Sequence, residues 1–198
     1  MSVSIDKSEF TQVVDFHGCY CLDIALGYRV AKALVREMGE HLNDMKKVYA
    51  YVGTNTCAVD AIQKITGCTA GKRNLIYADL GKSVFVLQNT VSGKTLRAYC
   101  HFWDQYDHTE MRAKRKAAAD DAADEQAKRQ FKTYIDAEIN RILTLEESQL
   151  FRITATQLPI PEKSSKYLSE PCARCGEFTK AELLRKQDEG KICPECSA

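Results

Sequence analysis

The chain has 198 residues, a length that suits one ordinary domain with a small appendage. Its 28 basic and 27 acidic side chains nearly cancel, so no global positive field recruits nucleic acid. No apolar run approaches the roughly 18 residues of a membrane span, and the N-terminus lacks the regions of a signal peptide. We therefore expect a soluble, cytoplasmic protein, whose nine cysteines are thiols or metal ligands and not a disulfide framework.

The first motif is His17-Gly18-Cys19-Tyr20-Cys21, in which every second side chain is a possible metal ligand. In an extended segment these side chains project to one face, where an imidazole and two thiols suit a transition metal. The alternative is that all three are buried packing residues. Helical spacing from Ile24 to Met38, ended by Gly39, places the motif at the N-terminus of a core helix. That position favours thiolates.

A sheet is expected next. The pattern predicts a short helix at residues 57–65, after Thr56, and strands at residues 48–52, 74–77, 83–87 and 94–102. The dipeptide Ser92-Gly93 predicts a hairpin between the last two strands. Helices and strands in this order indicate an α+β fold in which a core sheet packs against helices.

The character of the sequence changes near Thr109. Residues 112–130 are nearly all polar or alanine, whereas an apolar stripe runs from Phe131 to Leu143. We expect one or two long helices whose first part extends into solvent or lies against a partner subunit. The basic residues 112–116 are opposed by acidic residues 120–125, which favours a solvated helix over a nucleic-acid contact.

Pro159 and Pro161 predict a linker toward the C-terminus. We therefore divide the chain into a metal-binding core (1–108), a long helical region with a dimer contact (109–158), a linker (159–170) and a cysteine module (171–198).

The C-terminal module carries Cys172-Ala-Arg-Cys175 and Cys193-Pro-Glu-Cys196. Two such pairs are typical of a four-thiolate zinc site, because each short gap lets a turn direct both sulfurs at one ion. We expect a structural zinc in a small ribbon-like module. An iron–sulfur or rubredoxin-like iron site, two disulfides and a redox pair are the alternatives.

Several motifs across residues 10–100 together resemble the formylmethanofuran dehydrogenase E-subunit family, and the proline linker and four-cysteine tail resemble its longer members. The segments that carry the resemblance are residues 16–21, 24–29, 57–63, 66–72, 74–75 and 80–82. The resemblance implies an α+β core similar to the C-terminal domain of glyceraldehyde-3-phosphate dehydrogenase. It also implies a homodimer intertwined through the long helix and tail.

The resemblance further implies a metal-binding cleft formed by His17, Cys19, Cys21 and Cys57. The family commonly shows His-Gly-His-x-Cys-Pro-Gly, whereas this chain has Cys19 in place of the second histidine and Leu22-Asp23 in place of proline–glycine. Because a thiolate is softer than an imidazole, the metal preference is expected to shift, and zinc, nickel and iron remain candidates.

Other residues are candidates for supporting roles. Asp60, one turn beyond Cys57, is placed to orient an imidazole ligand or only to match the helix dipole. Cys68 is a second candidate beside the cleft, or a buried thiol. Residues 66–72 predict either an anion-binding loop with Lys72 and Lys82 or a plain turn.

Three functions are consistent with these patterns. The first is an accessory protein or subunit in one-carbon or molybdenum/tungsten enzyme metabolism, associated with a larger oxidoreductase complex. The second is a free-standing metal- or thiol-dependent enzyme acting on a small anionic substrate. The third is a nucleic-acid-binding zinc ribbon, which the near balance of charges in residues 169–198 makes the least favoured. The sequence does not decide whether a reaction is catalysed.

Overall fold

The structure is a computed structural model that describes residues 6–39, 47–119, 124–159 and 168–197. The chain divides into two compact units, Met1–Leu158 and Pro159–Ala198. No helix within the described ranges is long and apolar enough to cross a membrane.

The first unit contains a five-stranded sheet with strand order β2-β1-β3-β4-β5. The strands are β1 (Val48–Val52), β2 (Leu75–Tyr77), β3 (Val84–Asn89), β4 (Thr95–Cys100) and β5 (Phe151–Ala155). Strand β2 pairs in parallel with β1, and the other neighbours pair antiparallel. The predicted hairpin between β3 and β4 is confirmed, with Gly93 in a left-handed conformation at the turn.

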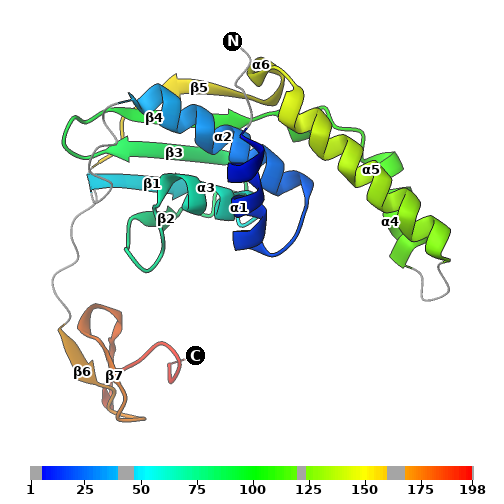
Figure 1. The fold of residues 1–198 in the computed structure, drawn as a ribbon. Helices are drawn as coiled ribbons and strands as arrows, with labels where there is room; N and C mark the ends of the chain where they lie inside the picture. Colours follow the sequence, from blue (N-terminus) through cyan, green and yellow to red (C-terminus); the bar gives the residue numbers. More distant parts are fainter. Residues whose placement is uncertain (1–5, 40–46, 120–123, 160–167, 198) are drawn as a thin grey trace. The chain divides into compact units, whose positions relative to one another are not determined.

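Helices α1 (Lys7–His17), α2 (Leu22–Met38) and α3 (Ala58–Thr66) gather on one side of the sheet (Figure 1). The largest buried side chains of α2 and α3, such as Ile24 and Ile62, belong to the same core as Val48 and Val52 of β1. The α+β prediction is therefore confirmed, with helices packed against a mostly antiparallel sheet.

Two elements were not predicted. Helix α1 buries only Phe10 and Val13, which is too little to give a clear helical period, although Asp6 caps it by accepting from the amides of Ser8 and Glu9. Strand β5 lies inside the region expected to be helical throughout, at residues 109–158. Its short alternation gives little signal, and pairing with β4 is what fixes it as an edge strand.

Helices α2 and α3 approach most closely at Gly27. A Cβ built there would lie 2.6 Å from both the Cα and the carbonyl oxygen of Ala58, the residue after Cys57. Since backbone atoms cannot move aside as a flexible side chain can, this contact requires glycine. It holds the start of α3 against the N-terminal half of α2.

Gly27→Ala is therefore expected to lower the free energy of unfolding by about 2–3 kcal/mol, the upper part of the range for overpacking. Urea unfolding followed by circular dichroism measures this change. Gly71→Ala is the matched control, because a Cβ at Gly71 meets no atom within 4 Å. Equal stabilities of the two variants would contradict the close helix contact.

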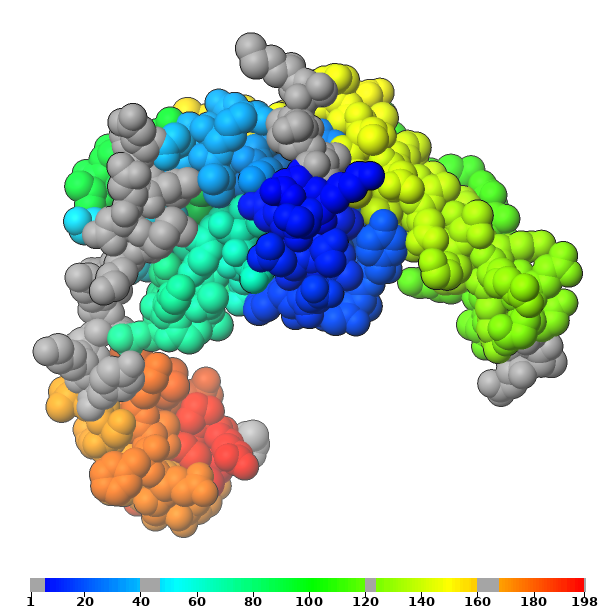
Figure 2. Space-filling model, viewed as in Figure 1, coloured from blue at the N-terminus to red at the C-terminus, as the bar shows by residue number. Residues whose placement is uncertain are grey.

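After the short turn η3 (Phe102–Asp104), α4 (His108–Ala119) and α5 (Glu125–Thr144) form a helical arm, and α6 (Glu147–Leu150) leads into β5. The arm projects from the body of the first unit (Figures 1 and 2). Only the C-terminal part of α5 joins the core, through Ile139, Ile142 and Leu143. Buried Arg29 fixes this end by donating to the carbonyls of Ile142, Leu143 and Leu145, at 2.6–2.8 Å.

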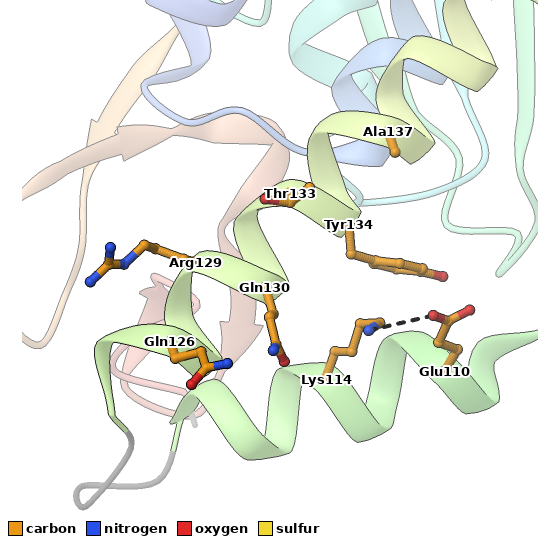
Figure 3. A pocket seen from close by; sticks show the side chains of 8 residues that line it. All are labelled: Glu110, Lys114, Gln126, Arg129, Gln130, Thr133, Tyr134 and Ala137. Carbon is orange, nitrogen blue, oxygen red and sulfur yellow. Dashed lines mark ion pairs between the residues drawn. The ribbon is translucent and has the colours of Figure 1, made fainter.

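The remainder of the arm is polar. Helix α4 has no buried residue, and an open groove of about 710 Å³ runs between α4 and α5 (Figure 3). Lys114 forms an ion pair with Glu110 at 3.5 Å and lies 5.7 Å from the centre of the Tyr134 ring. These paired charges agree with the solvated helical face predicted from the sequence.

The second unit is built from two hairpins, β6 (Ser169–Pro171) with β7 (Phe178–Lys180) and β8 (Arg185–Gln187) with β9 (Gly190–Ile192), joined by η4 (Ala181–Leu183). Its core consists of Ile192, partly buried Leu184 and the cysteines. Residues 160–167 of the expected linker lie outside the described residues, whereas Ser169 and Glu170 already belong to β6. The expected ribbon-like module is present.

Candidate metal sites

The first candidate site lies where α1 ends and α2 begins. His17 is the last residue of α1, and Gly18 reverses the chain with φ of 85°, a left-handed conformation that favours glycine. Cys21 is extended and is the N-cap of α2. One extended segment was expected here, but the side chains are instead brought together through a helix end and a tight turn.

The donor atoms of His17, Cys19 and Cys21 all lie within 4.8 Å of one another. Cys19 is exposed, whereas His17 and Cys21 are partly buried. Three soft donors at this spacing can face a single ion, which matches the grouping proposed from the sequence.

The two nitrogens of the His17 imidazole differ. Nδ1 lies 2.7 Å from Oδ2 of Asp60, and the other oxygen of Asp60 accepts from Gln63 at 2.9 Å. Nε2 is buried and has no hydrogen-bond partner within the described residues. A buried polar atom without a partner is costly, so this nitrogen is suited to a ligand that is not a protein group.

The expected contact of Asp60 with an imidazole is therefore present. It joins the first turn of α3 to the end of α1, across 43 residues of sequence. A carboxylate that accepts from one ring nitrogen fixes the tautomer and leaves the other nitrogen free to bind a metal.

Cys57 stands beside the cluster but not fully within it. Its thiol is close enough to Cys21 to raise the pKa of that group, yet it does not lie within 4.8 Å of all three other donor atoms. The four-residue cleft expected from the resemblance is therefore three grouped donors with Cys57 adjacent to Cys21. Cys57 occupies the N-cap of α3 and is partly buried.

The electrostatics of Cys21 differ from the sequence expectation. Burial raises the pKa of its thiol to about 12, and the neighbouring thiols of Cys57 and Cys19 act in the same direction. The position at the start of α2 supplies one stabilising amide, from Ile24, which does not outweigh these effects. The protein alone therefore does not stabilise a thiolate at Cys21, and a bound cation would have to do so.

Cys68 is separated from the cluster. It follows the C-terminal end of α3, whose nine residues span about 13 Å, whereas Cys57 stands at the opposite end. Its buried thiol donates to the carbonyl of Val48 at 3.5 Å, and burial raises its pKa. Cys68 is thus a core thiol and not a neighbour of the candidate ligands. Cys100 is likewise buried, and burial raises its pKa.

The loop after α3 does not present free amides to an anion. The amides of Cys68, Thr69, Lys72 and Arg73 all donate to acceptors between Thr66 and Asn74. The Lys72 ammonium group donates to the carbonyl of Gly67 at 3.0 Å, and Lys82 is exposed. This arrangement favours the plain-turn interpretation over an anion site at Lys72 and Lys82.

The second candidate site is the cysteine module. The thiols of Cys172, Cys175, Cys193 and Cys196 lie within 4.8 Å of one another, and all four are free cysteines. Those of Cys175 and Cys193 are 4.0 Å apart. Four sulfurs about 2.3 Å from one zinc in a tetrahedron would be separated by about 3.8 Å, whereas a disulfide requires about 2.05 Å. The geometry therefore fits a tetrahedral ion and not disulfides.

Backbone amides point at these sulfurs. The Cys172 sulfur accepts from the amides of Arg174 and Cys193, and the Cys193 sulfur accepts from the amide of Cys196. Amide hydrogen bonds lower the pKa of Cys172 to about 6, while the side chains of Cys193 and Cys175 raise that of Cys196 to about 12. One thiolate is thus prepared by the fold, and the others require a cation.

A pocket of about 410 Å³ adjoins the first cluster at Cys21. It is lined by Tyr20, Cys21, Leu22, Asp23, Thr56, Trp103, His108, Met111, Arg115, Phe131 and Ile135. The pocket was not predicted, because its residues come from five separate segments. The one available signal was Trp103, the only tryptophan in the chain.

Comparison with known proteins gives three findings. The model of a family described as "FmdE, Molybdenum formylmethanofuran dehydrogenase operon" matches residues 16–152. A "Probable S-adenosyl-L-methionine-binding protein" of Archaeoglobus fulgidus is 26% identical over 191 residues, which cover 92% of this chain and 50% of that protein. The chain thus spans about half the length of this relative.

A solved structure has a similar fold. It is an FmdE-like protein of the tungsten formylmethanofuran dehydrogenase type from Syntrophus aciditrophicus, 20% identical, with a TM-score of 0.63 over 100% of this chain and 95% of that chain.

Proposed function

The chain belongs to the FmdE family, and from this premise we propose that it is a metal-binding protein with a transition-metal site in the core and a structural zinc site in the tail. The observation that carries the proposal is His17. Its buried Nε2 atom has no hydrogen-bond partner within the described residues, and it lies within 4.8 Å of two thiols while Asp60 holds the other ring nitrogen.

In the core site, Nε2 of His17 and the sulfurs of Cys19 and Cys21 would bind the ion. Zinc, nickel and iron all accept this mixture of imidazole and thiolate ligands. The bound cation would supply the positive charge that converts the buried Cys21 thiol to a thiolate.

The fourth coordination position separates two roles. If Cys57 turns its thiol to the ion, the shell is closed and suits a structural or carrier protein. If the position stays open, it suits an enzyme that binds a substrate or water there. Three grouped donors with Cys57 adjacent leave both geometries within reach of one side-chain rotation.

Among biological roles, we favour an accessory protein or subunit in one-carbon or molybdenum/tungsten enzyme metabolism. The family description, which names a molybdenum formylmethanofuran dehydrogenase operon, supports this role. We further propose a homodimer through the helical arm, and membership of a larger oxidoreductase complex. The free-standing enzyme with an anionic substrate at Lys72 and Lys82 is less favoured, because the loop amides there are already paired.

A second candidate function is the binding of S-adenosyl-L-methionine. It is favoured by the archaeal relative, since 92% of this chain takes part in that match. Equilibrium dialysis of the metal-loaded protein with labelled S-adenosyl-L-methionine tests this candidate, and the absence of saturable binding would remove it.

Elemental analysis of the full chain after anaerobic purification tests the main proposal. We expect about two metal ions per chain, of which one is zinc. A chain that holds one ion or none, after loading with zinc, nickel and iron in turn, would contradict the two-site proposal.

Asp60→Asn provides a test that is specific to the core site. An asparagine keeps the size of the side chain but removes the charge that orients His17, so the affinity for the core metal is expected to fall about 10–100-fold. Competition with a chromophoric chelator measures this affinity. Asp79→Asn, on an exposed loop, is the matched control. An unchanged affinity in Asp60→Asn would mean that Asp60 has no part in holding the ligand.

A further inference from the structure

We propose that the pocket beside Cys21 binds a small aromatic organic anion, with its ring against Trp103 and Phe131 and its anionic group at Arg115. The pocket volume of about 410 Å³ lies within the usual range for small-molecule sites. Its inner end adjoins the candidate metal ligands, so the proposal deepens the proposed function by naming a class of molecule that reaches the core site. It does not require the metal, because the ring and charge contacts come from other residues.

The walls of the pocket explain the preference for an aromatic molecule. Met111 and Arg115 stand one turn apart on α4, and Phe131 and Ile135 stand one turn apart on α5, so each pair faces the pocket from its own helix. Trp103 closes the inner end and stacks on His108, with ring centres 5.6 Å apart and planes 20° apart. Flat aromatic and apolar surfaces on both sides favour a planar ring system between them.

The charges of the pocket are arranged along its length. Asp23 lies at the inner end, where it interacts with the Trp103 side chain. Arg115 lies seven residues beyond His108 on α4, a distance of about 10 Å along the helix. The pocket is therefore acidic near the thiol cluster and basic at its outer end, which orients a molecule with one anionic terminus.

Arg115 is available to bind that terminus. It is exposed, and it forms no ion pair with any carboxylate in the described part of the chain. Other cations of the arm already have acidic partners, such as Lys114 with Glu110 and Lys132 with Asp136. An unpaired guanidinium at the edge of an apolar pocket is a strong site for a carboxylate, sulfonate or phosphate group.

The dye 8-anilinonaphthalene-1-sulfonate is a suitable probe, because it combines an aromatic body with one anionic group. Trp103 is the only tryptophan of the chain, so energy transfer from tryptophan to the dye places the bound dye near this residue. We expect saturable binding of one dye per full-length chain, with quenching of the tryptophan emission.

Arg115→Gln is expected to weaken binding of the sulfonate dye about tenfold, the effect of losing one charge-assisted contact. Binding of the uncharged analogue N-phenyl-1-naphthylamine should remain unchanged. Arg112→Gln is the matched control, because Arg112 lies on the same helix but does not line the pocket. Both variants alter exposed side chains, and circular dichroism verifies that each is folded.

The proposal is overturned if Arg115→Gln weakens dye binding no more than Arg112→Gln, or if bound dye receives no energy from Trp103. Elemental analysis of the same samples keeps the metal proposal separate. A metal-free sample that binds the dye contradicts only the core metal site, whereas a metal-loaded sample without dye binding contradicts only the pocket.

Discussion

Cys196→Ser is expected to release the tail metal and unfold residues 168–197 while the first unit remains folded. The second unit has a core of only Ile192, Leu184 and the cysteines, which is too small to be stable alone. In such modules the free energy of zinc binding, about 10–16 kcal/mol in zinc-finger peptides, supplies the folding free energy. Loss of one of four sulfurs therefore removes most of what holds the hairpins together.

Limited trypsin digestion measures this unfolding directly. The module contains five cleavable side chains within its hairpins and turns, Arg174, Lys180, Arg185, Lys186 and Lys191. We expect fast cleavage at these sites in Cys196→Ser and slow cleavage in the unaltered protein. Cys19→Ser, the same substitution at an exposed cysteine of the other cluster, should leave the tail resistant. A Cys196→Ser protein that keeps its zinc and its resistance would show that the four thiols do not act as one site.

His17→Ala is expected to lower the affinity of the core site by more than about 100-fold, since removing a ligand costs more than removing the group that orients it. The reason is that Nε2 of His17 is the only nitrogen donor in the cluster. Cobalt substitution measures the loss, because sulfur-to-cobalt charge-transfer absorption reports each thiolate ligand. His101→Ala is the control, as His101 contacts the carbonyl of Ser148 and lies outside the cluster. Full cobalt absorption in His17→Ala would contradict the core site.

Cys57→Ser in the same assay decides between the two coordination geometries. Loss of one thiolate band together with weaker binding would identify a closed shell of four ligands. Unchanged absorption would identify an open position and favour catalysis.

The features that the sequence predicted well depend on local spacing. The pairs Cys172/Cys175 and Cys193/Cys196 each lie within one turn, so their grouping follows from distance along the chain. The hairpin at Gly93 and the helix from Leu22 to Met38 likewise depend on local patterns.

The features that were not predicted depend on tertiary contacts. Residues 17–21 were expected to be extended, because α1 has too weak a pattern to show that Gly18 ends a helix. The incomplete approach of Cys57 follows from how α3 sits against α2, which the Gly27–Ala58 contact determines. The pocket at Trp103 could not be found, since five segments must first be folded together.

The position of His17 at the very end of α1 links metal retention to the N-terminal helix. Because α1 buries few side chains, its local detachment should cost much less than global unfolding. Each detachment would carry away one ligand and also break the contact with Asp60. We therefore expect the dissociation rate of the core ion to follow the fraying of this helix, so that hydrogen exchange at its amides slows when the ion is bound.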